Sequence, residues 1–432
     1  MEQVQLWMLI PFVVMLLTIA IAPLAVEHWW EENRNKLIFT LLLSIPTAAV
    51  LALFGLGGNV VHQLLYDYIP FIVLLLALFV VTGGINIRGD IAATPAVNTI
   101  LLMIGWVLAS FMGTTGAAML LIRPLLQINQ QRVHRAHTVM FFIALVANCG
   151  GMLTPLGDPP LFLLYLRGAS FEWFAQLFPQ WAFVGLLLLL IYALADKYFY
   201  DREPADMRKR DDEEHEPIRV KGIVNFGWLA AVIAAVVFLN ASYIPAMADH
   251  HAPFYVKFLR EIVLLAIIFA SLKTTTKEVR TANNFSWGPI AEVAILFIGI
   301  FTTMTPALLY LNANAASLGM TEPWQFYYAT GVLSSFLDNA PTAVAFHTVA
   351  SGLPVVEGIP YVAGIPEVLL KTISLGAVFF GAMTYIGNGP NFMVKAIAEQ
   401  EGVKMPSFFG YMTKFSLIVL LPVYVIAQLI FF

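Results

Sequence analysis

Apolar segments long enough to cross a lipid bilayer dominate this chain. Residues 181–195, 224–239 and 412–432 approach or exceed the length that a helix needs to span about 30 Å of hydrocarbon. Hydrophobic residues make up 59% of the 432 residues and charged residues 12%, a proportion that the core of a water-soluble domain cannot hide. The two-residue alternation of an outer-membrane barrel strand is absent from the sequence. The sequence therefore predicts an all-α, polytopic integral membrane protein.

The charged segment 200–221 divides the apolar sequence into two halves. Its acidic and basic side chains are mixed, which favours a solvated loop over a lipid-binding patch. We predict a first half at residues 1–199, a cytoplasmic linker at 200–221 and a second half at 222–432. About ten transmembrane helices are expected, at residues 4–26, 37–55, 66–82, 138–167, 180–199, 222–245, 256–272, 290–311, 367–400 and 411–432.

Turn residues interrupt two apolar segments in each half. In the first half we predict a re-entrant hairpin at 95–127, broken around Gly113-Thr114-Thr115-Gly116, and a broken helix at 138–167. The second half has a predicted hairpin at 326–350, broken around Asp338-Asn339-Ala340-Pro341, and a broken helix at 367–400. Both halves therefore have the same order: three spans, a hairpin, a broken span and a final span.

The two halves also match in sequence at their broken helices. Thr154-Pro155-Leu156-Gly157-Asp158-Pro159-Pro160 aligns with Thr384-Tyr385-Ile386-Gly387-Asn388-Gly389-Pro390, with Thr, Gly, Asp or Asn, and Pro at shared positions. An odd number of spans in each half inverts the second half relative to the first. With the N-terminus outside, most Lys and Arg residues fall in cytoplasmic loops, as the positive-inside rule requires. We therefore predict two inverted-topology repeats in the cell inner (cytoplasmic) membrane.

Backbone that leaves a helix inside the bilayer needs new hydrogen-bond partners, so such breaks persist where they line a site. The first broken helix offers free carbonyls and the side-chain oxygens of Asn148, Thr154 and Asp158, which suit a hard cation. The second broken helix offers the matching side chains Thr384, Asn388 and Asn391. Discontinuous helices that meet near the midplane are typical of secondary transporters with inverted repeats.

Three charged residues in these segments each have two interpretations. Asp158 is either the cap of a half-helix or a cation and proton ligand, and the cost of a charge at membrane depth favours the ligand. Asp338 has the same alternatives, a cap or a proton carrier. Arg123 is expected at the inner membrane interface, with an anion contact as the alternative.

Other kinds of chemistry lack their sequence patterns. There is no phosphate-binding Gly-x-x-x-x-Gly-Lys-Ser/Thr loop, so ATP hydrolysis is not expected, and no spacing indicates a hydrolase. With a net charge of -4 and no basic stripe, the chain is not expected to bind nucleic acid. We predict a protein that is not an enzyme and has no cofactor.

The broken segments resemble those of the ion transporter superfamily, which includes D-type (NhaD-like) sodium/proton antiporters and citrate transporters. The similarity lies in residues 148–158, Asn-Cys-Gly-Gly-Met-Leu-Thr-Pro-Leu-Gly-Asp, and in residues 337–341, Leu-Asp-Asn-Ala-Pro. The resemblance implies two inverted repeats, each with a scaffold part and a mobile transport part. It also implies a homodimer that works by an elevator-like displacement.

Two transport hypotheses follow, together with a third in which the chain is a channel or scaffold without coupled transport. The first is a sodium/proton antiporter, which is favoured because neither hairpin has the paired Ser-Asn-Thr elements of dicarboxylate carriers. The alternative is a sodium- or proton-coupled symporter of citrate or another small carboxylate. The expected partners are membrane lipid and these small cations or carboxylates. The candidate cation and proton ligands are Asp158, Asp338, Asn148, Thr154, Asn339, Thr384 and Asn388, with sodium on Asn148 and Asp158; the candidate substrate contacts are Thr114, Thr115, Thr342 and Asn391.

Overall fold

The computed structural model of the protein describes residues 4–206, 216–249 and 251–432, and it is built mainly from helices. Within these residues, strands form only two two-stranded sheets. Among the described residues, seven helical segments are long and apolar enough to span a membrane: Leu6–Pro23, Asn33–Leu53, Gly57–Thr82, Pro95–Met112, Glu172–Tyr200, Gly288–Leu318 and Phe408–Phe431. The predicted class, an all-α polytopic membrane protein, is confirmed.

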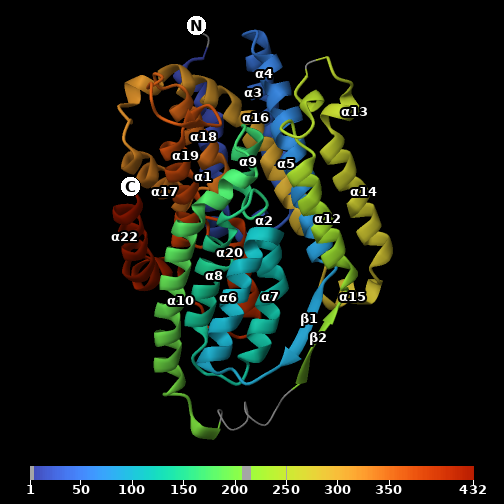
Figure 1. The fold of residues 1–432 in the computed structure, drawn as a ribbon, viewed down its shortest axis with the longest axis vertical. Coiled ribbons are helices and arrows are strands. Elements are labelled where there is room, and N and C mark those ends of the chain that lie inside the picture. The colour runs from blue at the N-terminus through green and yellow to red at the C-terminus, as the bar shows by residue number, and fades with distance from the viewer. Residues whose placement is uncertain (1–3, 207–215, 250) are drawn as a thin grey trace. The chain divides into compact units, whose positions relative to one another are not determined.

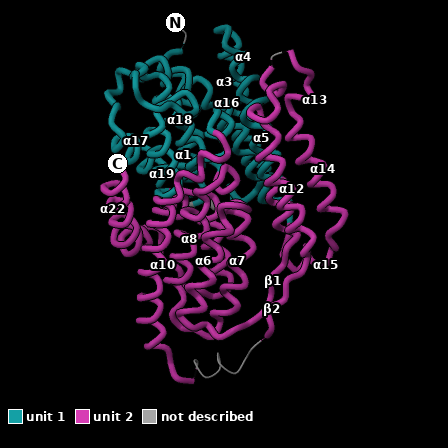
Figure 2. Tube along the Cα trace, in the orientation of Figure 1, with its two compact units in different colours: residues 1–76, 159–169, 286–380 teal, residues 77–158, 170–285, 381–432 magenta. Residues whose placement is uncertain are grey.

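The helices gather into two compact units, shown in different colours in Figure 2. Unit 1 contains residues 1–76, 159–169 and 286–380, and unit 2 contains residues 77–158, 170–285 and 381–432. Each unit therefore takes segments from both sides of the charged linker. The division into two sequence repeats is a separate property of the chain and stays a prediction.

Unit 1 is held together by long helices that pack along one another. α16 lies against α3 and α18, and α17 lies against α19. Lys36 on α3 forms an ion pair with Glu292 on α16, with 2.6 Å between Nζ and Oε1. The elements of this unit are η1 (Leu6–Leu9), α1 (Ile10–Ala25), α2 (Glu27–Trp30), α3 (Asn33–Leu53), α4 (Gly57–Gln63), η2 (Leu64–Tyr68), the first part of α5 (Ile69–Thr82), α9 (Pro159–Leu166), α16 (Gly288–Asn314), η6 (Ala315–Leu318), α17 (Pro323–Phe336), α18 (Asn339–Ser351), β3 (Tyr361–Val362), β4 (Ile365–Pro366) and α19 (Glu367–Phe380).

Unit 2 contains the first predicted hairpin and parts of both broken helices. α6 packs against α7 and α10, and α7 packs against α20. Its elements, besides the end of α5, are β1 (Asn86–Asp90), α6 (Pro95–Met112), α7 (Thr114–Ile128), α8 (Ala136–Leu145), η3 (Cys149–Met152), η4 (Glu172–Leu177), α10 (Phe178–Tyr200), β2 (Glu216–Lys221), α12 (Val224–Phe238), η5 (Pro245–Met247), α13 (Phe254–Lys257), α14 (Leu259–Thr274), α15 (Lys277–Ala282), η7 (Gly381–Met383), α20 (Gly389–Gln400), α21 (Phe408–Tyr411), η8 (Met412–Leu420) and α22 (Leu421–Phe431).

The hairpin of α6 and α7 turns at a single glycine. Thr94 caps the start of α6 by accepting a hydrogen bond from the Val97 backbone nitrogen at 3.3 Å. Gly113 has φ of 81°, a conformation that side chains with a Cβ rarely adopt. The helix resumes at once, so Thr114 and Thr115 are the first residues of α7 and not part of an extended break.

The linker is more structured than the sequence suggested. Residues 216–221 form β2, which lies beside β1 (Figure 1). The two strands pair antiparallel, with Arg219 opposite Arg88. Glu203, expected among solvated charges, is only 4% exposed. The middle of the linker, residues 207–215, lies outside the described residues. The prediction of a wholly solvated linker is therefore wrong at Glu203, whose carboxylate is buried, whereas residues 216–221 are exposed, although they form a paired strand.

Candidate functional site

The first broken helix of unit 2 leaves helical geometry after α8. Asn148 has φ of −141° and ψ of −84°, and the chain then makes the short 3-10 turn η3. Gly157 packs so closely on Gly151 that a Cβ on either residue would collide with the other's backbone. The Thr114 backbone nitrogen donates to the Gly157 carbonyl at 2.7 Å. The tip of the hairpin is thus fixed to the break.

Asp158 lies at the end of this break and is 1% exposed. The Thr114 hydroxyl donates to its Oδ1 at 2.7 Å. The Asn388 amide, from the second broken helix, donates to the same oxygen at 3.3 Å. Within unit 2, the structure therefore brings together a hairpin tip and two helix breaks around one carboxylate.

A chain of asparagine amides extends from this carboxylate. Asn388 Nδ2 also approaches Asn148 Oδ1 at 3.2 Å and the Ala147 carbonyl at 3.1 Å. Asn148 Nδ2 donates to Asn391 Oδ1 at 2.7 Å. All three asparagines are at most 3% exposed. Because a buried amide must find partners, these contacts fix the side chains in place.

Thr154 and Thr384 occupy equivalent positions in the two broken helices and use their hydroxyls alike. Thr154 Oγ1 accepts from the Leu156 backbone nitrogen at 3.1 Å, and Thr384 Oγ1 accepts from that of Ile386 at 3.2 Å. Thr154 also donates to the Ser110 carbonyl of α6. Both hydroxyls therefore support the shape of the breaks, and their role as cation ligands stays a prediction.

The remaining candidate residues are distributed between the units. Thr115, next to Thr114 in unit 2, is half-buried. Asp338, Asn339 and Thr342 belong to unit 1, where they start α18. Asp338 accepts a hydrogen bond from the Ala340 backbone nitrogen at 3.0 Å, and Thr342 donates to the Asp338 carbonyl at 2.9 Å. The structure thus shows the capping bond at Asp338, while its role as a proton carrier stays a prediction.

A second buried carboxylate in unit 2 was not anticipated from the sequence. Asp196 of α10 is fully buried and forms a two-pronged ion pair with Arg132, with distances of 2.7 and 3.1 Å. His137 Nε2 lies 2.8 Å from Asp196 Oδ1, and Asn98 Nδ2 donates to Oδ2 at 3.2 Å. An acidic residue inside a predicted span was the available signal, because such residues are expensive in a bilayer.

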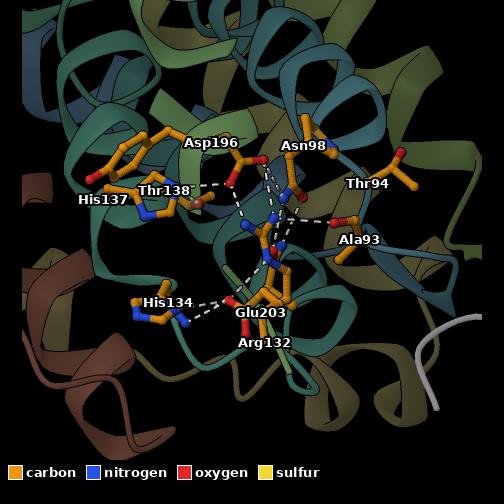
Figure 3. Close-up of polar contacts among 12 residues, drawn as sticks. Ala93, Thr94, Asn98, Arg132, His134, His137, Thr138, Asp196 and Glu203 are labelled. Atoms are coloured by element: carbon orange, nitrogen blue, oxygen red, sulfur yellow. Dashed lines mark hydrogen bonds and ion pairs between the residues drawn. The ribbon is translucent and has the colours of Figure 1, made fainter. Parts of the chain in front are cut away.

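Glu203 extends the same network, as Figure 3 shows, with Arg132 between the two carboxylates. Its carboxylate accepts bonds from the backbone nitrogens of Val133 and His134 at 3.0 and 2.8 Å. The His134 ring, whose side chain is 42% exposed, lies 3.3 Å from Glu203 Oε1. This network ties the start of the linker to the loop between α7 and α8.

The two clusters suit different chemistry. A guanidinium that bonds both oxygens of a carboxylate makes a fixed structural pair. Around Asp158, by contrast, the hydroxyl and amide partners are neutral, and oxygens of Asp158, Asn148 and Ala147 converge on one NH2 group of Asn388. Such an oxygen set is what a hard cation prefers. Among the described residues, no group of three or more His, Cys, Asp or Glu gathers to hold a transition metal.

Comparisons with known proteins identify the class of this chain. The family described as "Putative citrate transport" matches residues 1–432. A protein called "46 kDa membrane protein" from Mycobacterium leprae (strain TN) is 25% identical over 335 residues, which cover 74% of this chain and 73% of that protein. Together with the apolar helices, these matches make the chain a multi-pass integral membrane protein of a transport family.

Proposed function

We propose that this chain, which belongs to the citrate transport family, is a secondary active transporter that couples sodium and proton movement at Asp158. Transport as such follows from the family; the ion coupling is the proposal. The observation that supports it is the buried Asp158 carboxylate, held by the neutral groups of Thr114 and Asn388 where a hairpin tip meets two helix breaks. The simplest such transporter is a sodium/proton antiporter.

Competition for one group of oxygens produces exchange. A sodium ion bound beside Asp158 would replace the partial positive charge of the Asn388 NH2 group and use the oxygens of Asp158, Asn148 and Ala147. A proton on Asp158 removes the negative charge that the sodium ion needs. Each ion then shifts the alternating equilibrium only through its own binding. We therefore expect the apparent affinity for sodium to weaken as the pH falls.

The second candidate function is cation-coupled symport of citrate or another small carboxylate. The description of the family favours it. So does the start of α7 at the hairpin tip, because backbone N–H groups and the Thr114 and Thr115 hydroxyls suit an anion at a helix N-terminus. In this function Asp158 would bind only the coupling cation.

The same proposal includes the setting of the protein. Its Lys and Arg distribution supports a location in the inner membrane with linker 200–221 on the cytoplasmic side. The superfamily resemblance supports a homodimer with an elevator-like movement. Transported sodium and protons, with surrounding lipid, are the only small partners that the proposal requires.

The test uses purified protein in liposomes with a trapped pH-sensitive dye. Sodium is added first and citrate or succinate second, to the wild type, to Asp158→Asn and to the control Glu399→Gln, whose exposed carboxylate pairs with Lys395. Proton movement on sodium addition alone, lost in Asp158→Asn and kept in Glu399→Gln, supports the antiporter.

Proton movement that begins only after citrate or succinate is added, and that is lost in Asp158→Asn, would favour the symporter over the antiporter. Coupled movement of either kind that survives Asp158→Asn would refute Asp158 as the coupling group.

A further inference from the structure

We propose that a second pocket in unit 2 binds a small carboxylate or phosphate oxyanion. The pocket has a volume of about 450 Å³ and lies between β1, the C-terminal part of α7 and the end of α20. Arg88, Arg123 and Arg135 all line it. Nothing in the ion coupling proposed for Asp158 uses these side chains.

The three guanidinium groups lack carboxylate partners within the described residues. Arg88 Nη2 donates to the Ala282 carbonyl at 3.3 Å, and Arg135 Nη2 donates to the Glu401 carbonyl at 3.2 Å. For Arg123 the described part of the chain supplies no hydrogen bond or ion pair. Backbone carbonyls thus orient two of the guanidiniums, and most of their N–H donors stay available.

The charge of the lining favours an anion. The charged residues that line the pocket are three arginines and one glutamate, Glu401, so the lining has an excess of positive charge. Like charges that share a cavity repel, and an anion between them removes the repulsion. Guanidinium forks match the paired oxygens of a carboxylate or a phosphate. The amide of Gln127, which also lines the pocket, adds a neutral donor.

The side chains that bond Asp158 lie at the starts of α7 and α20, whereas the pocket lies towards the C-terminal ends of these two helices. α7 carries Thr114 at its start and Arg123 nine residues later, roughly 14 Å along the helix axis. α20 begins beside Asn388 and ends at Glu401, and the two helices pack together. An anion in the pocket would therefore contact the far ends of both helices without reaching the proposed cation ligands. The pocket is a separate site, and its occupancy can differ from that of Asp158.

Two sources offer the same ligand chemistry: a free carboxylate such as citrate, and the headgroup of an anionic lipid. The first arm of the test is calorimetric titration of citrate into delipidated protein at constant ionic strength. We expect binding in the wild type and in Asp158→Asn, at least tenfold weaker binding in Arg123→Gln, and none in the Arg123→Gln/Arg135→Gln double variant. Arg202→Gln is the control, because Arg202 stacks on Tyr198 and does not line the pocket.

The second arm measures retained phosphatidylglycerol by native mass spectrometry. Lipid bound to the wild type but lost from the double variant supports the same site with a lipid headgroup as the occupant. Melting temperatures of all variants establish that they are folded. If Arg123→Gln fails to fold, Arg123→Lys takes its place, because lysine keeps the positive charge but lacks the paired N–H donors of the guanidinium.

The proposal is overturned if neither citrate nor phosphatidylglycerol binding depends on Arg123 and Arg135. It is also overturned if citrate binding is lost in Asp158→Asn and kept in the arginine variants, because the citrate then occupies the transport site.

Discussion

Asp158 and Asp196 are both buried carboxylates of unit 2, and both accept a hydrogen bond from an asparagine amide, Asn388 and Asn98 respectively. They differ in their other partners. Asp196 binds the guanidinium of Arg132 through both of its oxygens, whereas Asp158 accepts a threonine hydroxyl. A buried ion pair is rigid because each charge needs the other. A carboxylate held by neutral groups can exchange them for an ion. Burial alone therefore does not identify a transport site; the partners do.

The largest expected effect is on the ion-paired cluster. Arg132→Met leaves Asp196 and Glu203 buried without their guanidinium, and we expect it to lower the free energy of unfolding by about 3 to 5 kcal/mol. Thermal unfolding in detergent measures this. Arg202→Met, which removes an exposed guanidinium, is the matched control. A loss of less than about 1 kcal/mol in Arg132→Met would show that the network is not structural.

A smaller effect is expected at the cluster of neutral groups around Asp158. This effect is on transport and not on the free energy of unfolding. Thr114→Val keeps the shape of the side chain but removes the hydroxyl that donates to Asp158. A hydrogen bond to a charged group is worth about 1.5 to 3 kcal/mol, so the apparent affinity for the coupling cation should change by about tenfold or more. Flux measured against sodium concentration tests this, with Thr99→Val as the control, because the half-buried Thr99 hydroxyl donates to the Pro95 carbonyl of its own helix. If both variants changed the apparent affinity for sodium equally, the Thr114 hydroxyl would not be part of the cation site.

The comparison is sharpest in the stability of Asp158→Asn. Asparagine still offers Thr114 an acceptor oxygen, so we expect the free energy of unfolding to fall by less than about 1 kcal/mol, even though coupled transport is lost. The melting temperature of Asp158→Asn beside that of Arg132→Met measures the contrast. If the two variants were equally unstable, Asp158 would be a structural carboxylate like Asp196.

The smallest effect is expected at the rim of the ion-paired cluster. His134→Ala removes a partly exposed ring, while Glu203 keeps both of its backbone N–H donors. Because the ring is partly exposed and Glu203 keeps its other donors, the change in unfolding free energy should stay below about 1 kcal/mol. Melting curves of the wild type and of His134→Ala measure it, and a loss of more than about 1 kcal/mol would contradict this account.

The sequence predicted the helical membrane class because long apolar segments have few other stable folds. It also located helix breaks, since Gly113 and the residues before Pro159 and Gly389 are unusual inside apolar segments, and the structure has helix ends at these places. Such signals are local. They need no knowledge of which helices pack together.

The Arg132 network could not be predicted in the same way. Arg132 and Glu203 stand among loop charges that look solvated, and only packing brings them to Asp196. The composition of the two units was also out of reach, because it depends on tertiary contacts between distant segments. For the same reason, the sequence suggested that Thr154 and Thr384 are ligands, while the structure also shows their hydroxyls bonded to backbone.

The strand pair of β1 and β2 has a consequence for protein engineering. If the gene is divided within the linker, before Glu216, β1 stays on the first fragment and β2 becomes the start of the second. The antiparallel register, in which Asn86 lies opposite Lys221 and Ile87 opposite Val220, would then have to form between two separate chains. Co-expressed fragments would therefore each contain one strand of a pair that can form between them, with no added dimerisation domain.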